Sequence, residues 1–281
     1  MIKPTSLNAR GTRGRAAPRQ AATADRHQLY EDAVQCVEAE IDFVDAEFKR
    51  LRGRTAHVLR EDFCGTANTS CEWVRRRRTN VALAVDLDPE VLNWGRTHHV
   101  AKLTPAARAR IELIEGDVVQ VKTRPVDIVL AMNFSYFLLK ERTRMRAYFK
   151  RARASLVEDG VLFLDCFGGY EAFQVLQEHT EYEHFTYTWE HASYNPINGD
   201  LVCHIHFSFP DGSKMKQAFT YEWRLWTLPE IREILAEAGF SRTAVYWQGW
   251  DEKEETGSGE FTEVEVADPD AGWICYIAAE K

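Results

Sequence analysis

The stretch VLREDFCGTA, residues 58–67, decides the fold. The mostly apolar run 56–59 predicts a buried strand, and a helical pattern begins at Asn68. Between the two, Gly65 and Ala67 keep the turn small, so that the backbone can come close to a ligand while the first N–H groups of the helix face an anion. The stretch therefore predicts a strand, a tight turn and a helix, with a binding site where the strand ends.

The alternation of strand and helix continues toward the C-terminus. Apolar runs predict further strands at 81–85, 111–114, 126–132 and 161–165. Helices are expected at 68–78, from Asp88 onward and at 141–156. Short apolar strands that alternate with helices form parallel sheets covered on both faces. We therefore expect an α/β fold with a doubly wound, mostly parallel seven-stranded sheet.

The pattern changes after about Tyr170. Three longer strands are expected at 183–194, 201–209 and 215–226, joined by the hairpin turn signals Asn198-Gly199 and Asp211-Gly212. These strands predict a three-stranded antiparallel insertion at about residues 183–226. A helix at 229–238 and strands at 243–247 and 273–278 follow, and the acidic segment 251–260 between these strands is expected to be a solvated loop.

The N-terminal segment differs in composition from the rest of the chain. Residues 1–27 carry six cationic side chains and one anionic one, a net charge of +5, which leaves −13 for the rest of a chain whose total is −8. They have almost no large apolar side chains, so we expect a disordered basic tail. From Tyr30 an apolar stripe at helical spacing runs to Gly53, which predicts an N-terminal helix at 28–54 packed on a core domain at 55–281.

Composition and charge narrow the classes of function. With 45% hydrophobic and 28% charged residues the chain is typical of a soluble globular protein. It has no apolar run long enough to cross a membrane, no apolar leader, and six scattered cysteines, so we expect a cytoplasmic protein with reduced thiols and no structural metal. Nucleic acid is a disfavoured partner, because the acidic body offers little phosphate neutralisation.

Polar side chains follow the expected strands at the points where each strand ends. Glu61 follows the first strand, and Asp86 lies 25 positions beyond it, near the spacing at which a carboxylate accepts hydrogen bonds from a nucleotide ribose. Asp117 follows the third strand and Asn133 the fourth. Ligands of open α/β sheets bind beyond the carboxyl ends of the strands, where the strand order reverses. We expect these side chains to share one site.

These segments, in this order, resemble the motifs of class I S-adenosylmethionine (SAM)-dependent methyltransferases of the small-molecule type. Residues 58–67 resemble the motif acidic-x-Gly-x-Gly-x-Gly, 85–90 the acidic motif after the second strand, and 115–118 the adenine-contacting motif. Residues 127–133 and 158–163 resemble the motifs that follow. The match runs from about residue 56 to 281, and it implies a Rossmann-like methyltransferase fold, SAM as the cofactor and a small-molecule methyl acceptor as the partner.

The resemblance also implies roles for matching positions. Asp86 would hold the ribose hydroxyls, with Leu87 against the adenine, and Asp117 would accept from the adenine amino group with Val118 beside it. Asn133 would lie near the sulfonium. The residues that would line the methionine portion are Glu61, Cys64, Gly65 and Thr66.

Two positions depart from the motif's glycines. Phe63 stands where the motif has its first glycine, and Ala67 where it has its third. A bulky residue with a positive φ is an outlier. We therefore expect the turn to follow a different path at Phe63.

Aromatic and polar residues of the insertion are candidates for the acceptor site. We expect the insertion to cover the acceptor, and Asp165, at the end of the fifth strand, and Tyr136 to orient or deprotonate it as catalytic residues. His204 and His206 alternate with apolar neighbours, so both rings should share one strand face. The candidate acceptor-binding residues are Tyr136, Trp189, His204, His206 and Trp223.

Three other functions remain compatible with these patterns. A nicotinamide-dependent oxidoreductase shares the strand, small turn, helix and acidic residue, although the third glycine is missing here. A non-catalytic SAM-binding or partner-binding module would tolerate Phe63 in the turn. An RNA methyltransferase would use the basic tail, and its RNA binding would weaken steeply with salt.

Overall fold

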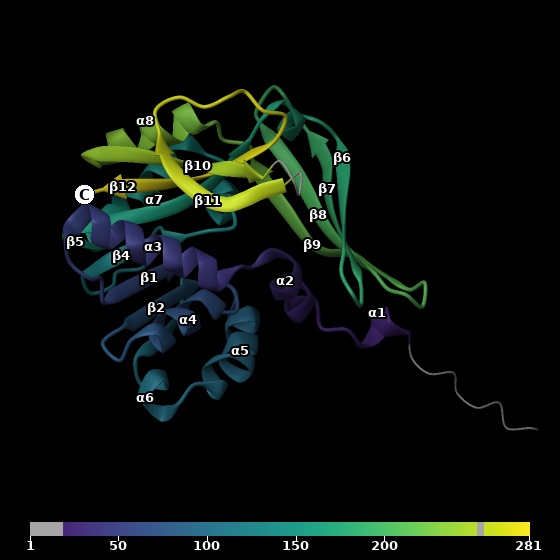
Figure 1. Ribbon diagram of the computed structural model, residues 1–281, viewed down its shortest axis with the longest axis horizontal. Helices are drawn as coiled ribbons and strands as arrows, with labels where there is room; N and C mark the ends of the chain where they lie inside the picture. The colour runs from purple at the N-terminus through teal and green to yellow at the C-terminus, as the bar shows by residue number, and fades with distance from the viewer. Residues whose placement is uncertain (1–18, 252–255) are drawn as a thin grey trace, which may run out of the picture.

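The computed structural model describes residues 19–251 and 256–281, which fold around a large and a smaller sheet (Figure 1). The large sheet has eight strands in the order β11-β10-β12-β5-β4-β1-β2-β3. They are β1 (Val58–Asp62), β2 (Val81–Asp86), β3 (Ile111–Glu115), β4 (Val126–Ala131), β5 (Leu156–Gly168), β10 (Arg242–Asp251), β11 (Thr256–Val264) and β12 (Trp273–Glu280). Strands β1 to β5 pair in parallel, and β10, β11 and β12 pair antiparallel. The doubly wound α/β fold predicted from the sequence is confirmed.

Helices cover both faces of the large sheet because alternate strand residues point to opposite faces. On one face lie α3 (Val37–Arg52), α4 (Asn68–Arg76) and α5 (Pro89–His98). Ile41 and Phe48 of α3 belong to the same buried cluster as Leu59 and Phe163 of the sheet. On the other face α7 (Arg142–Ser155) and α8 (Leu228–Ala238) contribute to a second cluster, which contains Leu162.

The strand order reverses between β1 and β4. From β1 the chain adds β2 and β3 on one side, and it then crosses to add β4 and β5 on the other. The short elements η1 (Val100–Lys102), α6 (Pro105–Arg108), η2 (Ser135–Leu138) and η3 (Tyr170–Phe173) lie in the connections. An open α/β sheet binds its ligand at such a reversal, beyond the carboxyl ends of the strands. The topology therefore places the candidate site at the ends of β1, β2 and β4.

The large sheet has one strand more than the expected seven. The segment 251–260, expected to be a solvated loop, contains the first part of β11, which pairs antiparallel with β10 from Asp251↔Thr256 to Val245↔Val264. This edge strand is rich in polar residues and glycine, so its sequence lacks the apolar alternation of a half-buried strand. Pairing with β10, rather than local sequence, gives the segment its structure.

The antiparallel insertion has four strands rather than three. Its order is β6 (Leu176–Glu181), β7 (Thr186–Tyr194), β8 (Asp200–Ser208) and β9 (Lys214–Arg224). The missed strand β6 is an edge strand with a single large apolar residue, Leu176, so hydrophobic patterning did not reveal it. The two predicted hairpin turns are confirmed, since Gly199 and Gly212 have φ angles of 77° and 76°.

The N-terminal segment departs from the expected boundaries. Of the predicted disordered tail, residues 1–18 lie outside the described residues, whereas α1 (Gln20–Thr23) and the start of α2 (Arg26–Val34) are helical. The single helix predicted at 28–54 is two helices, because the chain leaves helical geometry at Gln35 and Cys36 before α3 begins. Gly53 ends α3 in the left-handed conformation, as predicted.

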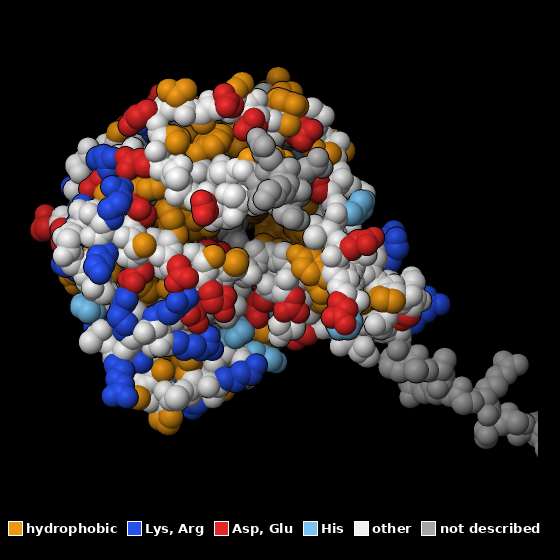
Figure 2. Space-filling model, in the orientation of Figure 1, with side chains coloured by type: hydrophobic (Ala, Val, Ile, Leu, Met, Phe, Trp, Pro, Cys, Tyr) orange, Lys and Arg blue, Asp and Glu red, His pale blue; other side chains and the backbone are white. Residues whose placement is uncertain are grey.

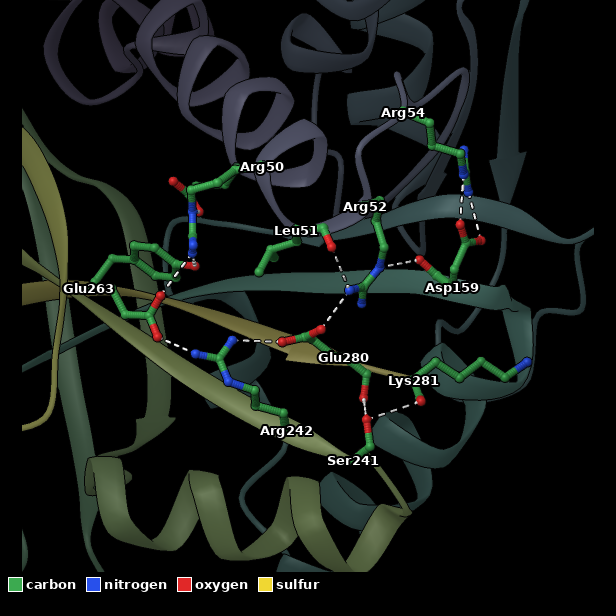
Figure 3. Close-up of polar contacts among 12 residues, drawn as sticks. Arg50, Leu51, Arg52, Arg54, Asp159, Ser241, Arg242, Glu263, Glu280 and Lys281 are labelled. Atoms are coloured by element: carbon green, nitrogen blue, oxygen red, sulfur yellow. Dashed lines mark hydrogen bonds and ion pairs between the residues drawn. The ribbon is translucent and has the colours of Figure 1, made fainter.

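Arginines near the end of α3 tie this helix to the antiparallel edge of the large sheet (Figure 3). Arg50 pairs with Glu263 of β11 at 2.8 Å, and Arg52 pairs with Glu280 of β12 at 2.6 Å. Arg242 of β10 bridges the same two glutamates, at 2.7 Å from Glu280. Because the ion pairs share partners, they form one network that fixes α3 across three strands.

No helix among residues 19–251 and 256–281 is long and apolar enough to cross a membrane.

Candidate functional site

Three carboxyl groups lie at the ends of adjacent strands. Glu61 is near the end of β1, Asp86 ends β2, and Asp117 follows β3 by two residues. The strands are neighbours in the sheet, and Asp86 is in register with Glu115. The three side chains expected from the sequence to share a site therefore do lie along one rim of the sheet.

The Glu61 carboxylate is buried and turned toward helix α4. It accepts hydrogen bonds from the backbone N–H of Ser70 at 2.9 Å and from the Ser70 hydroxyl at 2.5 Å. Burial raises the pKa of Glu61 to about 8, and the nearby carboxylates of Glu40 and Asp86 add to the effect. A cation placed beside Glu61 would reverse this shift, because it would favour the charged form.

The turn after β1 keeps the backbone close to β2. Cys64 donates its N–H to the carbonyl of Val85 at 3.0 Å, and Gly65 donates its N–H to the Asp86 carboxylate at 2.8 Å. Phe63 and Gly65 have φ angles of 56° and 52°. The prediction that the turn follows a different path at Phe63 is therefore wrong. Phe63 itself adopts a positive φ, and its ring packs against Tyr148 at a centroid distance of 5.5 Å.

Asp86 and Leu87 present a carboxylate and an apolar side chain side by side. The Asp86 carboxylate accepts from Gly65 N and from Asp88 N at 2.9 Å, and burial raises its pKa. Leu87 is 68% exposed, which is unusual for a leucine directly after a buried strand. A bound ring would cover this side chain, and a ribose would find free lone pairs on the neighbouring carboxylate.

Hydrogen bonds and an ion pair with other protein residues stabilise the loop after β3. Asp117 accepts from Val119 N at 2.9 Å and pairs with Arg144 at 2.8 Å. Val118 is buried, and its carbonyl accepts from the Arg60 guanidinium at 3.2 Å. The loop is thereby held against the end of β1.

Arg60 is a structural residue that the sequence analysis missed. It is fully buried and pairs with Asp62 at 2.7 Å, while it donates to Ser155 of α7 at 2.9 Å. The signal that could have found it was its spacing: residues i and i+2 of a strand share a face, so an arginine two positions before Asp62 in an apolar strand predicts a buried pair. The pair joins β1, the loop after β3 and α7.

The two predicted catalytic residues support the turn after β4 instead of lining a cavity. The Asp165 carboxylate accepts from the backbone N–H groups of Asn133 and Phe134, at 2.6 and 2.9 Å, and burial raises its pKa to about 8. Tyr136 is fully buried and donates its hydroxyl to the Asp165 carbonyl at 2.6 Å. Asp165 and Tyr136, expected to orient or deprotonate an acceptor, therefore both hydrogen-bond to the backbone, and neither is among the residues that line the two cavities described below.

Asn133 occupies a turn that this network imposes. Its φ is 59°, in the left-handed region that asparagine tolerates better than most residues. The Asp165 carboxylate fixes this conformation through the two N–H groups. As a result Asn133 faces both cavities described below.

Helix α2 forms a wall of a small pocket of about 170 Å³ over the turn after β1. Glu31 of α2 accepts from the Thr66 hydroxyl at 2.6 Å and contacts His99 Nε2 at 2.7 Å. Asp25 accepts from the Trp94 indole at 2.7 Å. The residues lining the pocket include Tyr30, Glu61, Cys64, Gly65, Thr66, Asn133 and Tyr221.

A larger cleft of about 420 Å³ lies between the antiparallel sheet, the ends of β4 and β5 and the segment before β12. It shares Tyr30, Asn133 and Tyr221 with the small pocket, so the two cavities adjoin. Figure 2 shows a hollow on this face, with hydrophobic side chains inside it and acidic side chains gathered along one rim. The arrangement could hold one ligand over the sheet and a second beside it.

The structure brings one of the predicted insertion residues to this cleft. Trp189 lines it, whereas Trp223 is buried behind it in the core. His204 and His206 do share a strand face, but it is the outer one. There His206 contacts Glu190 at 2.9 Å, and His204 contacts Thr220 at 2.9 Å. The two histidines expected to bind an acceptor are therefore not among the residues that line the cleft.

The inner face of the insertion supplies residues that sequence reasoning missed. Cross-strand pairing puts Glu178, Trp189 and Ile205 on one row, with His191 two residues beyond Trp189 on the same face. All four residues line the cleft. Residues i and i+2 of a strand share a face, so the spacing of Trp189 and His191 could have indicated that they lie together, but only the packing of the sheet decides which face is inside.

The cleft carries ionisable groups that lack partners. Glu171 and Glu178 form no ion pair or side-chain hydrogen bond with the described residues, although both line the cleft. His191 is buried, and burial lowers its pKa. A polar or cationic ligand would complement these groups.

Comparisons with known proteins bear on the fold. No protein-family model matches the chain, and no curated protein matches it in sequence. Among solved structures it is similar to an S-adenosylmethionine-dependent methyltransferase from Clostridium acetobutylicum ATCC 824, with a TM-score of 0.66 at 17% identity over 90% of this chain and 96% of that one.

Two further structures have the same architecture. SAM-bound CalS10, an amino pentose methyltransferase from Micromonospora echinaspora, has a TM-score of 0.64 at 17% identity over 91% of this chain and 96% of that one. DesVI from Streptomyces venezuelae has a TM-score of 0.65 at 15% identity over 91% and 98%. The chain has the Rossmann-like fold of SAM-dependent methyltransferases, along nearly its whole length.

Proposed function

We propose that this chain is a SAM-dependent methyltransferase that acts on a small molecule bound in the larger cleft. One observation carries the proposal: carboxyl groups lie at the ends of three adjacent strands, one of them, Glu61, lines a small pocket, and this pocket adjoins a second, aromatic cleft. The strand ends together with the small pocket would take an adenosyl ligand, and the cleft would take a methyl acceptor. The fold, shared with enzymes that use this cofactor, supports the same assignment.

The residues at the rim fit SAM part by part. The Asp86 carboxylate would accept hydrogen bonds from both ribose hydroxyls, and Leu87 would lie against the adenine. Asp117 would accept from the adenine amino group, with Val118 beside it. The buried Glu61 carboxyl group fits a positively charged methionine portion, because a cation would stabilise its ionised form.

The turn after β1 and the turn after β4 would surround the rest of the cofactor. Cys64, Gly65 and Thr66 line the small pocket, and Asn133 lies where the pocket meets the cleft. When bound, SAM supplies a methyl group on a positively charged sulfur that is a good leaving group. The protein's contribution is then to align the acceptor with that methyl group, which accounts for roughly 7–11 kcal/mol of barrier lowering in well-oriented reactions.

The cleft favours an amine of about the size of a sugar as the acceptor. Glu171 and Glu178 would attract a cationic amine, and the faces of Trp189 and Tyr221 would pack against its apolar parts. Among the similar structures, CalS10 is an amino pentose methyltransferase and KedS8 a sugar N-methyltransferase. Nitrogen is therefore the acceptor atom that we propose.

Calorimetric titration with S-adenosylhomocysteine (SAH), the demethylated form of the cofactor, tests the cofactor site. Asp86→Ala should weaken binding by about tenfold to a hundredfold, the loss expected for a charge-assisted hydrogen-bonding group worth about 1.5–3 kcal/mol. Glu112→Ala is the matched control, because Glu112 is an exposed acid on β3 away from the rim. Unchanged affinity in Asp86→Ala would remove the ribose assignment, and no binding to the wild-type protein would remove the proposed function.

A further inference from the structure

His191 stands out among the cleft residues that the cofactor site does not use. It lies on β7, opposite Leu176 of β6 and Cys203 of β8, and only 6% of its surface is exposed. Its ring packs near Trp189 and Phe167, at centroid distances of 5.8 and 6.1 Å. Both aromatic neighbours line the cleft, so the imidazole forms part of its wall.

The enclosed ring nitrogen of His191 has no partner within the described residues. Nδ1 is fully buried and accepts or donates no hydrogen bond there. A buried polar atom without a partner is unfavourable, and such atoms are rare in folded proteins. Because Nδ1 is enclosed, a ligand in the cleft would meet the imidazole through Nε2, which is not enclosed in this way and forms no hydrogen bond with the described residues.

The surroundings of His191 favour the neutral ring and also allow it to gain a proton. Burial lowers its pKa, while the Glu178 carboxylate on β6 and the backbone of Gln174 and Glu171 act in the opposite direction. The other titratable groups that face it are the Glu171 carboxylate from η3 and the buried Cys203 thiol from β8. A neutral imidazole beside carboxylates can take a proton, and the carboxylates then stabilise the imidazolium.

We propose that His191 takes the proton that an acceptor amine must release before methyl transfer, an inference that rests on the function proposed above. The amine enters the cleft as an ammonium ion, drawn by Glu178 and Glu171. One N–H bond breaks, its proton moves to the imidazole, and the nitrogen keeps the electron pair. The nitrogen then bonds to the methyl carbon, the electron pair of the broken C–S bond stays on sulfur, and His191 later returns its proton to water.

Nuclear magnetic resonance of histidine-labelled protein tests this role with a simple amino sugar in place of the natural acceptor. The probe is D-glucosamine, added to the SAH complex at rising concentration, with D-glucose as the probe that lacks the amine. The His191 ring signals are assigned as those missing from the spectrum of the His191→Asn variant. We expect glucosamine, but not glucose, to shift these signals. The signals of His204, on the outer face of the same sheet, should stay unchanged.

Turnover supplies the second readout. His191→Asn should lower kcat for SAH formation from SAM and glucosamine by roughly a hundredfold or more, the usual contribution of a general base, and should remove the acid limb of the kcat/KM pH profile. His204→Asn should leave both unchanged. Two results would overturn the role of His191 and leave the proposed cofactor site intact. In the first, SAH binds but glucosamine does not shift the His191 signals; in the second, the acid limb of the kcat/KM pH profile is still present in His191→Asn. If SAH itself does not bind, the proposed function fails.

Discussion

The burial of the Glu61 carboxyl group affects both the stability of the fold and the binding of a ligand. Its carboxyl group is buried beneath the pocket and receives two hydrogen bonds from Ser70, yet its pKa is raised to about 8. The folded protein therefore retains a proton that the unfolded chain, with a pKa near 4.5, releases. The same desolvation makes the site favourable for a cationic ligand.

This difference predicts a pH dependence of stability. Between the unfolded pKa of 4.5 and the folded pKa of about 8, the folded state binds more protons, so the free energy of unfolding should fall as pH rises. Glu61→Gln keeps an acceptor for Ser70 but removes the titration, so its stability should fall less over this interval. Urea denaturation at a series of pH values measures the two slopes. Equal slopes in the wild type and in Glu61→Gln, with Glu112→Gln as the control, would contradict the assignment.

Some residues of the site could be predicted from the sequence, and others could not. Glu61, Asp86 and Asp117 were visible because strand ends of a parallel sheet meet at one rim, whatever the details of packing. Asp165 was also visible as a strand-end acid, but its hydrogen bonds to the turn after β4 depend on a tertiary contact. His191 was hidden because its role depends on which face of β7 is inside.

Helix α2 is the element that joins the two cavities. It contributes Tyr30 to both of them, and its Leu29 packs in a cluster with Phe185 and Phe207 of the antiparallel sheet. Through Glu31 it also contacts Thr66 in the turn after β1 and His99 at the end of α5. The helix therefore links the insertion to the proposed cofactor site.

Removal of the Glu31 contact should loosen this helix. In Glu31→Ala, Thr66 and His99 lose their shared acceptor, and the free energy of local opening of α2 should fall by about 1–3 kcal/mol. Hydrogen exchange of α2 amides, followed by mass spectrometry, measures the change. Asp32→Ala is the control, since Asp32 is an exposed acid on the same helix. Faster exchange in both variants, or in neither, would show that Glu31 does not hold the helix.

At the scale of elements, sequence patterns identified strands with apolar runs or apolar alternation and missed two polar edge strands. The five parallel strands and the strands of the two hairpins have apolar runs or alternation that buried surfaces require. The edge strands β6 and β11 are polar, because one side of each faces solvent. The break between α2 and α3 was missed because the apolar stripe continues across it, although the chain changes direction at Cys36.

The molecule as a whole places two sites on one side of a sheet whose order reverses between β1 and β4. One site lies over the strand ends, and the other lies under the antiparallel sheet. Their shared residues Tyr30, Asn133 and Tyr221 mark where a transferred group would pass. The α/β layout was predictable from the order of strands and helices, whereas the contact between the two sheets, where Leu201 and Trp223 join the same buried cluster as Leu164, depends on packing between segments far apart in the chain.

A crystal structure of the SAH complex tests the central claim most directly. We expect the adenosyl group along the ends of β1, β2 and β3, with both ribose hydroxyls at about 2.5–2.7 Å from the Asp86 carboxylate and the sulfur directed at the larger cleft. The adenine should cover Leu87. Density for SAH elsewhere, or a ribose that does not contact Asp86, would contradict the account.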